Sequence, residues 1–243
     1  MTRVQLTDPD WEFIEPYLPI GEYGLYPERL RQQFEGVIWR FKTGGQWREM
    51  PTVFGAWSTV HNRFRQWRDA GVFEALLEGL ITEAAKRGEA DLSLVSIDST
   101  TARAHHDAAG MHLDEDVVTA LEKVRVRGPV GRTRVRPGAV AGDKAYSSRG
   151  NHAHLRKRRI KAVIPEKKDQ AANRKKKGSR GGRPVSHDAD LYKERNTVEL
   201  LINKLRAWRG IATRYDKTPD SYLAGLHLRA SMIWIKDLTR PTR

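Results

Sequence analysis

The sequence predicts a helical region over residues 1–88, followed by an α/β layer with parallel strands over residues 89–243. Residues 1–88 carry apolar side chains at helical spacing between capping residues, prolines and glycines. From about residue 92, short runs rich in β-branched residues alternate with a helical segment, the order that parallel strands require. A chain of 243 residues is long enough for one or two domains with a buried core.

Four helices are predicted in the N-terminal region. The segment TDPDWEFIEPYLP begins at a capping threonine or aspartate and ends at Pro19, and PERLRQQFEGVIWRFKTGG ends at a Gly-Gly pair. The third and fourth helices are predicted in AWSTVHNRFRQWRDAG and VFEALLEGLITEAAKRG. In the third helix the predicted buried face consists of Trp57, Val60, Phe64 and Trp67.

The opposite face of the third helix is polar. It carries His61, Asn62, Arg65 and Arg68. This pattern fits a helix-turn-helix-like DNA-binding module, and it fits a plain helical bundle with solvated arginines equally well.

Three strands and two further helices are predicted after residue 89. The strands lie in LSLVSIDST, GAVAGDKAYSS and IKAVIPEK, with a helix predicted in DEDVVTALEK between the first two. Residues 166–185 lack apolar periodicity and are rich in Lys, Arg and Gly, which predicts a mobile basic loop. A helix capped by Asp190 and a final helix in TPDSYLAGLHLRASMIWIKDL are expected to close the chain.

The charge distribution points to a polyanionic partner. The chain has 44 basic and 30 acidic residues, a net charge of +14. Residues 1–97 hold 11 basic and 14 acidic side chains, so the remainder holds 33 and 16, a net of +17. Residues 156–183 alone contain 13 basic and two acidic residues. Such a surface favours nucleic acid over a merely solvated basic face.

Several classes of protein are not expected. The absence of cysteine excludes disulfides and thiolate metal sites. The N-terminus lacks the apolar core of a signal peptide, and no apolar run has membrane-spanning length. We therefore expect a cytoplasmic, nucleoid-associated protein with no membrane partner.

Three carboxylates are candidate ligands of a divalent metal. Asp98 and Asp143 each end a predicted strand, and the carboxyl ends of parallel strands meet at one edge of a sheet. Glu199 shares a narrow helical stripe with Tyr192, Arg195 and Arg206, within about 60° at 100° per residue. Oxygen ligands of this kind suit Mg²⁺, and two such ions can cleave a phosphodiester.

Plainer interpretations exist for each carboxylate alone. Asp98 and Asp143 could be strand-end turn residues. Glu199 could form an i,i+4 ion pair with Arg195 that stabilises the helix by a few tenths of a kcal/mol. The combination of all three with a basic surface favours metal chemistry on DNA.

The segments SIDSTTARAHH, AGDKAYSS and YKERNTVELLINKLRAWRGIATRYDK resemble bacterial insertion-sequence transposases of the DDE class. Tyr192, Arg195 and Glu199 match the family signature Tyr-x2-Arg-x3-Glu-x6-Lys, with Arg206 in the lysine position. The segments GVIWRFKTGGQWREMP and FGAWSTVHNRFRQWRDAG resemble the N-terminal domain of the same proteins.

The resemblance implies an RNase H-like catalytic domain over residues 89–243, with Asp98, Asp143 and Glu199 as the catalytic triad binding Mg²⁺ or Mn²⁺. It implies cleavage of double-stranded DNA at the terminal inverted repeats, transfer into target DNA, and a homodimer on DNA. The residues predicted to contact DNA, from the resemblance and the basic patches, are Tyr192, Arg195, Arg206, Lys144, Arg63, Arg65, Arg68, Lys175, Lys176, Lys177 and Arg180.

One departure from the family concerns length. Asp98 and Asp143 are 45 positions apart, whereas the family has a longer segment with two further strands. This indicates an internal deletion that would leave the first strand as an exposed apolar edge. Two alternatives stay open: a catalytically impaired, truncated transposase that only binds DNA, and a nuclease that cleaves without strand transfer.

Overall fold

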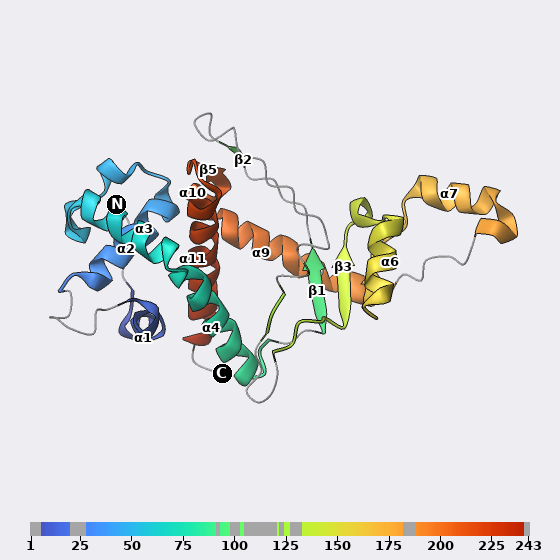
Figure 1. Cartoon of the computed structure of the whole chain (residues 1–243), viewed down its shortest axis with the longest axis horizontal. Helices are drawn as coiled ribbons and strands as arrows, with labels where there is room; N and C mark the ends of the chain where they lie inside the picture. The colour runs from blue at the N-terminus through green and yellow to red at the C-terminus, as the bar shows by residue number, and fades with distance from the viewer. Residues whose placement is uncertain are drawn as a thin grey trace. The chain divides into compact units, whose positions relative to one another are not determined.

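The computed structural model describes residues 6–19, 28–90, 93–97, 103–104, 121, 124–126, 133–181 and 188–240. These residues fall into two compact units (Figure 1). Unit 1 draws its residues from within 1–84, 101–112 and 203–243, and unit 2 from within 85–100 and 113–202. The C-terminal helices therefore pack with the N-terminal ones, while the predicted division at residue 88 stays a proposal about domains.

Unit 1 is built mainly of α-helices. They are α1 (Asp8–Ile14), α2 (Leu30–Thr43), α3 (Trp57–Asp69), most of α4 (Val72–Lys86), α10 (Arg209–Ala212) and α11 (Pro219–Leu238). Short 3-10 turns are η1 (Glu15–Tyr17), η2 (Trp47–Glu49) and η3 (Thr52–Phe54). The four predicted N-terminal helices are thus confirmed as elements, but a helix-turn-helix-like arrangement remains a prediction.

Local signals set two helix ends of unit 1 where the sequence predicts them. Thr7 caps α1 in a reciprocal capping box with Asp10. Gly44 ends α2 with φ of 70°, a left-handed conformation that glycine adopts without steric cost. Both signals depend only on residues close in sequence, which explains why they can be recognised without a structure.

Aromatic side chains form the core of unit 1. Phe64 has ring centroids 5.5 Å from Phe41, 5.4 Å from Trp47 and 5.8 Å from Phe73. Trp67 is fully buried, as predicted, but Trp57 is 38% exposed. The prediction that Trp57 is buried is wrong, because Trp57 is the first residue of α3 and lies at the end of the buried face. The Arg48 guanidinium lies 5.5 Å from the centroid of its ring.

The C-terminal helices approach α2 through glycines. A side chain at Gly225 of α11 would collide with the buried ring of Phe41. A Cβ at Gly210 of α10 would lie 2.6 Å from the carbonyl oxygen of Phe41. Glycine at these positions permits the close contact of α10 and α11 with α2.

Unit 2 contains a three-stranded parallel sheet. Its strands are β1 (Leu94–Ile97), β3 (Ala139–Gly142) and β4 (Lys161–Val163), in the order β1-β3-β4. All three lie in segments predicted to be strands. Among the described residues β1 pairs with β3 alone, which agrees with the expected edge position of the first strand.

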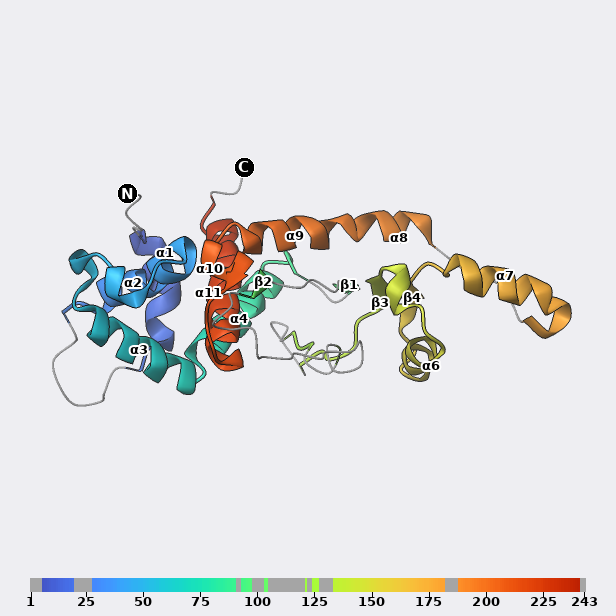
Figure 2. The same cartoon turned by 90° about the horizontal axis from the view of Figure 1, so that it is seen from above.

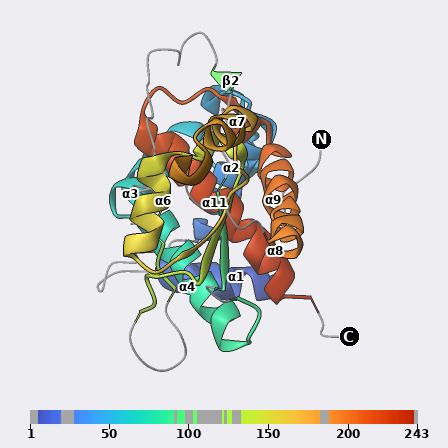
Figure 3. The same ribbon diagram turned by 90° about the vertical axis from the view of Figure 1, so that its right-hand side faces the viewer.

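Helices cover the two faces of this sheet (Figure 3). Val140 packs with Leu155 of α6 (Arg149–Lys157) on one face. On the other face, Leu191 and Tyr192 of α8 (Ala189–Glu194) pack against a cluster of small side chains, namely Ala139, Ala141 and Val163. The remaining elements of unit 2 are η5 (Lys144–Tyr146), α7 (Lys168–Lys176), η6 (Gly178–Gly181) and the start of α9 (Asn196–Arg206).

The segment predicted as one helix from residue 192 is divided. In Figure 2, α8 runs directly into α9, with a turn at Arg195 between them. Asp188, not Asp190, caps α8 by accepting from the Leu191 amide at 3.1 Å. After α10 the chain forms β5 (Thr213–Arg214), which pairs in parallel with β2 (Arg103–Ala104).

Part of the expected core of α9 is not buried. The helical period places Leu201 on the apolar side of this helix, where burial is expected, but its side chain is 43% exposed; Leu200 is 60% exposed. No side chain of α9 is buried. The helical period predicts which side chains share a face, but a face is buried only if another element packs against it. On this side of the sheet, the apolar cluster packs against α8 and not α9.

Candidate active site

Asp143 lies at the carboxyl end of β3. Its Oδ1 accepts a hydrogen bond from the Ala145 amide at 2.7 Å, so it caps η5. Asp143 therefore acts as the strand-end turn residue considered from the sequence, and this hydrogen bond uses one of its carboxylate oxygens. The second oxygen, Oδ2, has no hydrogen-bond partner among the described residues.

Asp98 lies outside the described residues, and the structure reports the strand that precedes it. Ile97 pairs with Gly142 in the parallel register of β1 and β3. These two residues come directly before Asp98 and Asp143 in the sequence. The paired strands therefore end in step at the two predicted aspartates.

Glu199 is in the first turn of α9 and is held by an arginine. Its Oε1 lies 3.3 Å from Arg195 Nη1, the i,i+4 ion pair considered as the plainer interpretation. The Glu199 side chain is 53% exposed, whereas that of Arg195 is 14% exposed. The Arg195 guanidinium also lies 5.9 Å from the ring centroid of Tyr192. The structure thus brings together three of the four residues of the polar stripe.

The donor set suits a hard divalent cation in kind. Within the described part of the chain, no group of three or more His, Asp or Glu side chains converges as a metal site. Asp98, one of the three predicted carboxylates, lies outside that part of the chain. Asp143 and Glu199 each keep one oxygen that makes no hydrogen bond to described residues, and carboxylate oxygens are the ligands that Mg²⁺ prefers.

The predicted basic loop is in part a helix. Residues 168–176 form α7, and residues 178–181 form η6, so the prediction of a loop over 166–185 is wrong for this stretch. The segment KDQAANRKK is rich in strong helix formers, although it has no apolar periodicity. Four cations predicted to contact DNA are exposed here: Lys175, Lys176, Lys177 and Arg180.

The other predicted DNA contacts differ in their availability. Lys144, directly after Asp143, and Arg206, at the end of α9, are exposed. On α3, Arg65 is exposed and Arg63 is half-buried, with Nη1 3.4 Å from Gln66. Arg68 is engaged within the protein, since it pairs with Asp69 at 2.7 Å and donates to Ser221 Oγ at 2.7 Å.

Sequence reasoning missed a buried charge cluster in unit 1. Arg40 lies 3.8 Å from Asp216, with the two side chains 7% and 9% exposed. The Arg40 guanidinium lies 5.7 Å from the Trp47 ring centroid and 5.9 Å from that of Tyr215. Burial raises the pKa of Asp216, and the charge of Arg40 opposes that rise. The partners are far apart in sequence, so no local pattern could have paired them.

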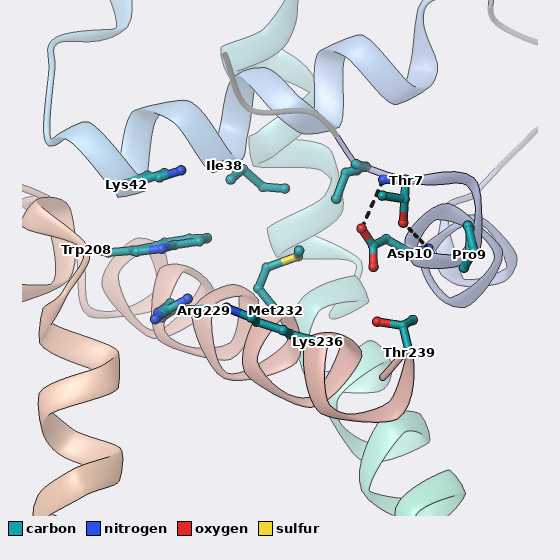
Figure 4. Close-up of a pocket in the computed structure, with 11 residues that line it drawn as sticks. Thr7, Pro9, Asp10, Ile38, Lys42, Trp208, Arg229, Met232, Lys236 and Thr239 are labelled. Carbon is teal, nitrogen blue, oxygen red and sulfur yellow. Dashed lines mark hydrogen bonds between the residues drawn. The ribbon is translucent and has the colours of Figure 1, made fainter. Parts of the chain in front are cut away.

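Unit 1 also contains a cavity of about 580 Å³ (Figure 4). Trp208 forms one wall, and the Arg229 guanidinium lies 4.9 Å from its ring centroid. Arg229 donates to the Lys204 carbonyl oxygen through Nε at 3.0 Å and Nη2 at 2.6 Å. None of the predicted site residues lines this cavity.

Membrane-spanning helices are absent from the described residues, since none of their helices combines the necessary length and hydropathy.

Comparisons with known proteins identify two family regions. Residues 6–77 match the family described as "Putative transposase of IS4/5 family", and residues 114–234 match the family described as "Transposase DDE domain". No solved structure matches the chain.

Three curated relatives are similar over parts of the chain. An "Uncharacterized protein y4sN" of Sinorhizobium fredii is 35% identical over 107 residues, 43% of this chain and 81% of the relative. An "Insertion element IS402 uncharacterized 16.2 kDa protein" of Burkholderia cepacia is 32% identical over 112 residues, 43% and 76% of the two chains. The "Putative transposase for insertion sequence element IS6501" of Brucella ovis is 35% identical over 99 residues, 41% and 68%.

Three observations indicate the same family. They are the contacts among the signature residues Tyr192, Arg195 and Glu199, the two matched family regions, and the relatives from insertion elements. The chain belongs to the DDE transposases of bacterial insertion sequences.

Proposed function

We propose that this protein cuts DNA strands at the ends of its insertion sequence and joins the released 3′-hydroxyl ends to target DNA, with Asp98, Asp143 and Glu199 as its metal ligands. The observation that supports this most is the parallel pairing of Ile97 with Gly142, one residue before each aspartate. Parallel strands that end in step favour the convergence of the side chains that follow them. The Transposase DDE domain match implies an RNase H-like fold for this region.

Asp98, Asp143 and Glu199 would hold Mg²⁺ or Mn²⁺, which when bound supplies the positive charge that activates water and stabilises the leaving oxygen of a phosphodiester. Arg195 forms an ion pair with Glu199 and so orients its carboxylate. The Arg195 guanidinium is planar and always charged, so it would also suit a DNA phosphate beside Glu199. Lys144 follows Asp143 directly and is exposed, so it would bind the strand that is cut.

Other basic residues would bind parts of the duplex that are distant from the cleavage point. The exposed lysines on and after α7 and the exposed Arg65 of α3 are suited to the phosphate backbone, which attracts cations regardless of sequence. We expect the element's terminal inverted repeats as the substrate, a homodimer as the acting species and the nucleoid as its location.

The alternative is a transposase relative that binds element ends without cutting them. The separation of 45 positions between Asp98 and Asp143 supports it, because the family has a longer segment there. The ion pair between Arg195 and Glu199 is compatible with both functions.

Mg²⁺-dependent nicking of end-sequence DNA separates the two functions. We expect wild-type protein and Glu194→Gln to nick, and Glu199→Gln to lose nicking by at least about 100-fold while still binding DNA. Glu194 is a matched control because it is an exposed glutamate five positions earlier. Equal nicking by wild type and Glu199→Gln would reject the triad, and binding without nicking by the wild type would favour the alternative.

A further inference from the structure

The helix α7 is docked onto the loop that follows Asp143. The Gln170 side chain makes two hydrogen bonds to one residue: its Nε2 donates to the Ser147 carbonyl oxygen at 2.7 Å, and its Oε1 accepts from Ser147 Oγ at 3.0 Å. One turn later, Arg174 forms a two-point ion pair with Glu166, with Nε–Oε1 at 3.1 Å and Nη2–Oε2 at 3.0 Å. Polar contacts, and no apolar face, therefore hold this helix.

The point of attachment is itself fixed. Ser147 is 2% exposed, and its Oγ lies 3.4 Å from His152 Nε2. The preceding carbonyl oxygen, that of Tyr146, accepts from Asn151 Nδ2 at 3.0 Å. The loop from Asp143 to Ser147 is thus held at both ends, by the Asp143 cap and by these bonds.

The rest of α7 presents positive charge to solvent. At about 100° per residue, Lys168 and Lys175 lie roughly opposite Gln170 on the helix. Lys168, Lys175 and Lys176 are exposed and have no hydrogen-bond or ion-pair partner among the described residues. The charge of Arg174, on the docked side, is already neutralised by Glu166. The helix therefore separates a docking face, defined by Gln170 and Arg174, from a cationic face, defined by Lys168, Lys175 and Lys176.

The chain after α7 turns back onto the helix. Gly178 has φ of 53°, and a side chain at Gly181 would collide with the Arg174 backbone. This return places η6, which contains Arg180, against the C-terminal part of α7.

We propose that Ser147 and Gln170 form a positioning link, which sets the cationic face of α7 against the DNA backbone beside the bond that Asp143 helps to cleave. The inference rests on the proposed function. Lysines attract phosphates regardless of DNA sequence. Two hydrogen bonds fix α7 to the loop after Asp143, so the lysines of α7 would hold the duplex in one position relative to that aspartate. The partner is the phosphate backbone of double-stranded DNA, and Gln170 acts through placement without touching the reacting atoms.

The test uses the absence of natural cysteines. Ala172, exposed on α7 and uncharged, is changed to cysteine and carries an iron chelate that cleaves nearby DNA by hydroxyl radicals. With otherwise wild-type protein we expect cuts confined to a few nucleotides near the element end. Adding Gln170→Ala should widen the cut region at least about threefold while affinity stays within about threefold, because every cation remains.

A DNA-free measurement separates failure of the link from failure of the proposed function. Nitroxides at Ala172→Cys and Ala153→Cys report the distance from α7 to α6 in unit 2, and we expect Gln170→Ala to broaden its distribution. Gln170→Ala favours helix formation, so the helix itself should persist. An unchanged distance distribution, or equally confined cuts with and without Gln170→Ala, would overturn the link. A broadened distribution with no end-specific cuts in either protein would retain the docking and reject the proposed function.

Discussion

The two units differ in the size of the side chains that form their cores. Unit 1 is packed with large rings, among them Phe64, which contacts both Phe41 and Phe73. Unit 2 has a sheet of three short strands whose side facing α8 is built from Ala139, Ala141 and Val163. Large buried rings contribute more stability than small aliphatic side chains, so unit 1 has the stronger core. The proposed catalytic residues lie on the sparser unit, as expected for sites that must open to a substrate.

The tryptophans allow this contrast to be measured. All seven, at positions 11, 39, 47, 57, 67, 208 and 234, lie within the ranges of unit 1. Tryptophan fluorescence therefore reports on unit 1, while circular dichroism reports on the helices of both units.

The largest effect should come from the aromatic core. Phe64→Ala removes a buried ring that contacts three others, so we expect the free energy of unfolding to fall by about 3–5 kcal/mol. Urea unfolding followed by tryptophan fluorescence measures the change. Trp57→Ala, at the exposed start of the same helix, is the control and should cost much less. Equal losses in the two variants would show that burial does not distinguish these positions.

The smallest effect should come from α9. Leu201→Ala removes an exposed leucine from a helix with no buried side chain, so we expect a change within about 0.5 kcal/mol in urea unfolding followed by circular dichroism. Leu155→Ala, in the core of the same unit, is the matched control and should cost about 2–5 kcal/mol. A loss at Leu201 as large as that at Leu155 would mean that α9 is covered in solution.

Features set by local chemistry could be predicted from the sequence. The cap at Thr7, the helix end at Gly44 and the strands leading to Asp98 and Asp143 depend on neighbouring residues or on short apolar runs. The pairing of Tyr192, Arg195 and Glu199 also follows from the helical period.

Features set by distant partners could not be predicted. The helix α7 is held by hydrogen bonds from Gln170 to Ser147, which leave no apolar period in the sequence. The pairing of Arg40 with Asp216 joins residues at opposite ends of the chain. The family signature supplied the proposed role of Glu199, which its helix position alone would have assigned to an ion pair.

Metal binding tests the central claim most directly. Mn²⁺ binding is titrated by electron paramagnetic resonance, with end-sequence DNA present, for wild-type protein, Asp143→Asn, Glu199→Gln and the control Glu194→Gln. The account predicts that each of the first two substitutions weakens Mn²⁺ binding by at least about tenfold while the control leaves it unchanged. Equal Mn²⁺ affinity in all four proteins would contradict the assignment of Asp143 and Glu199 as metal ligands.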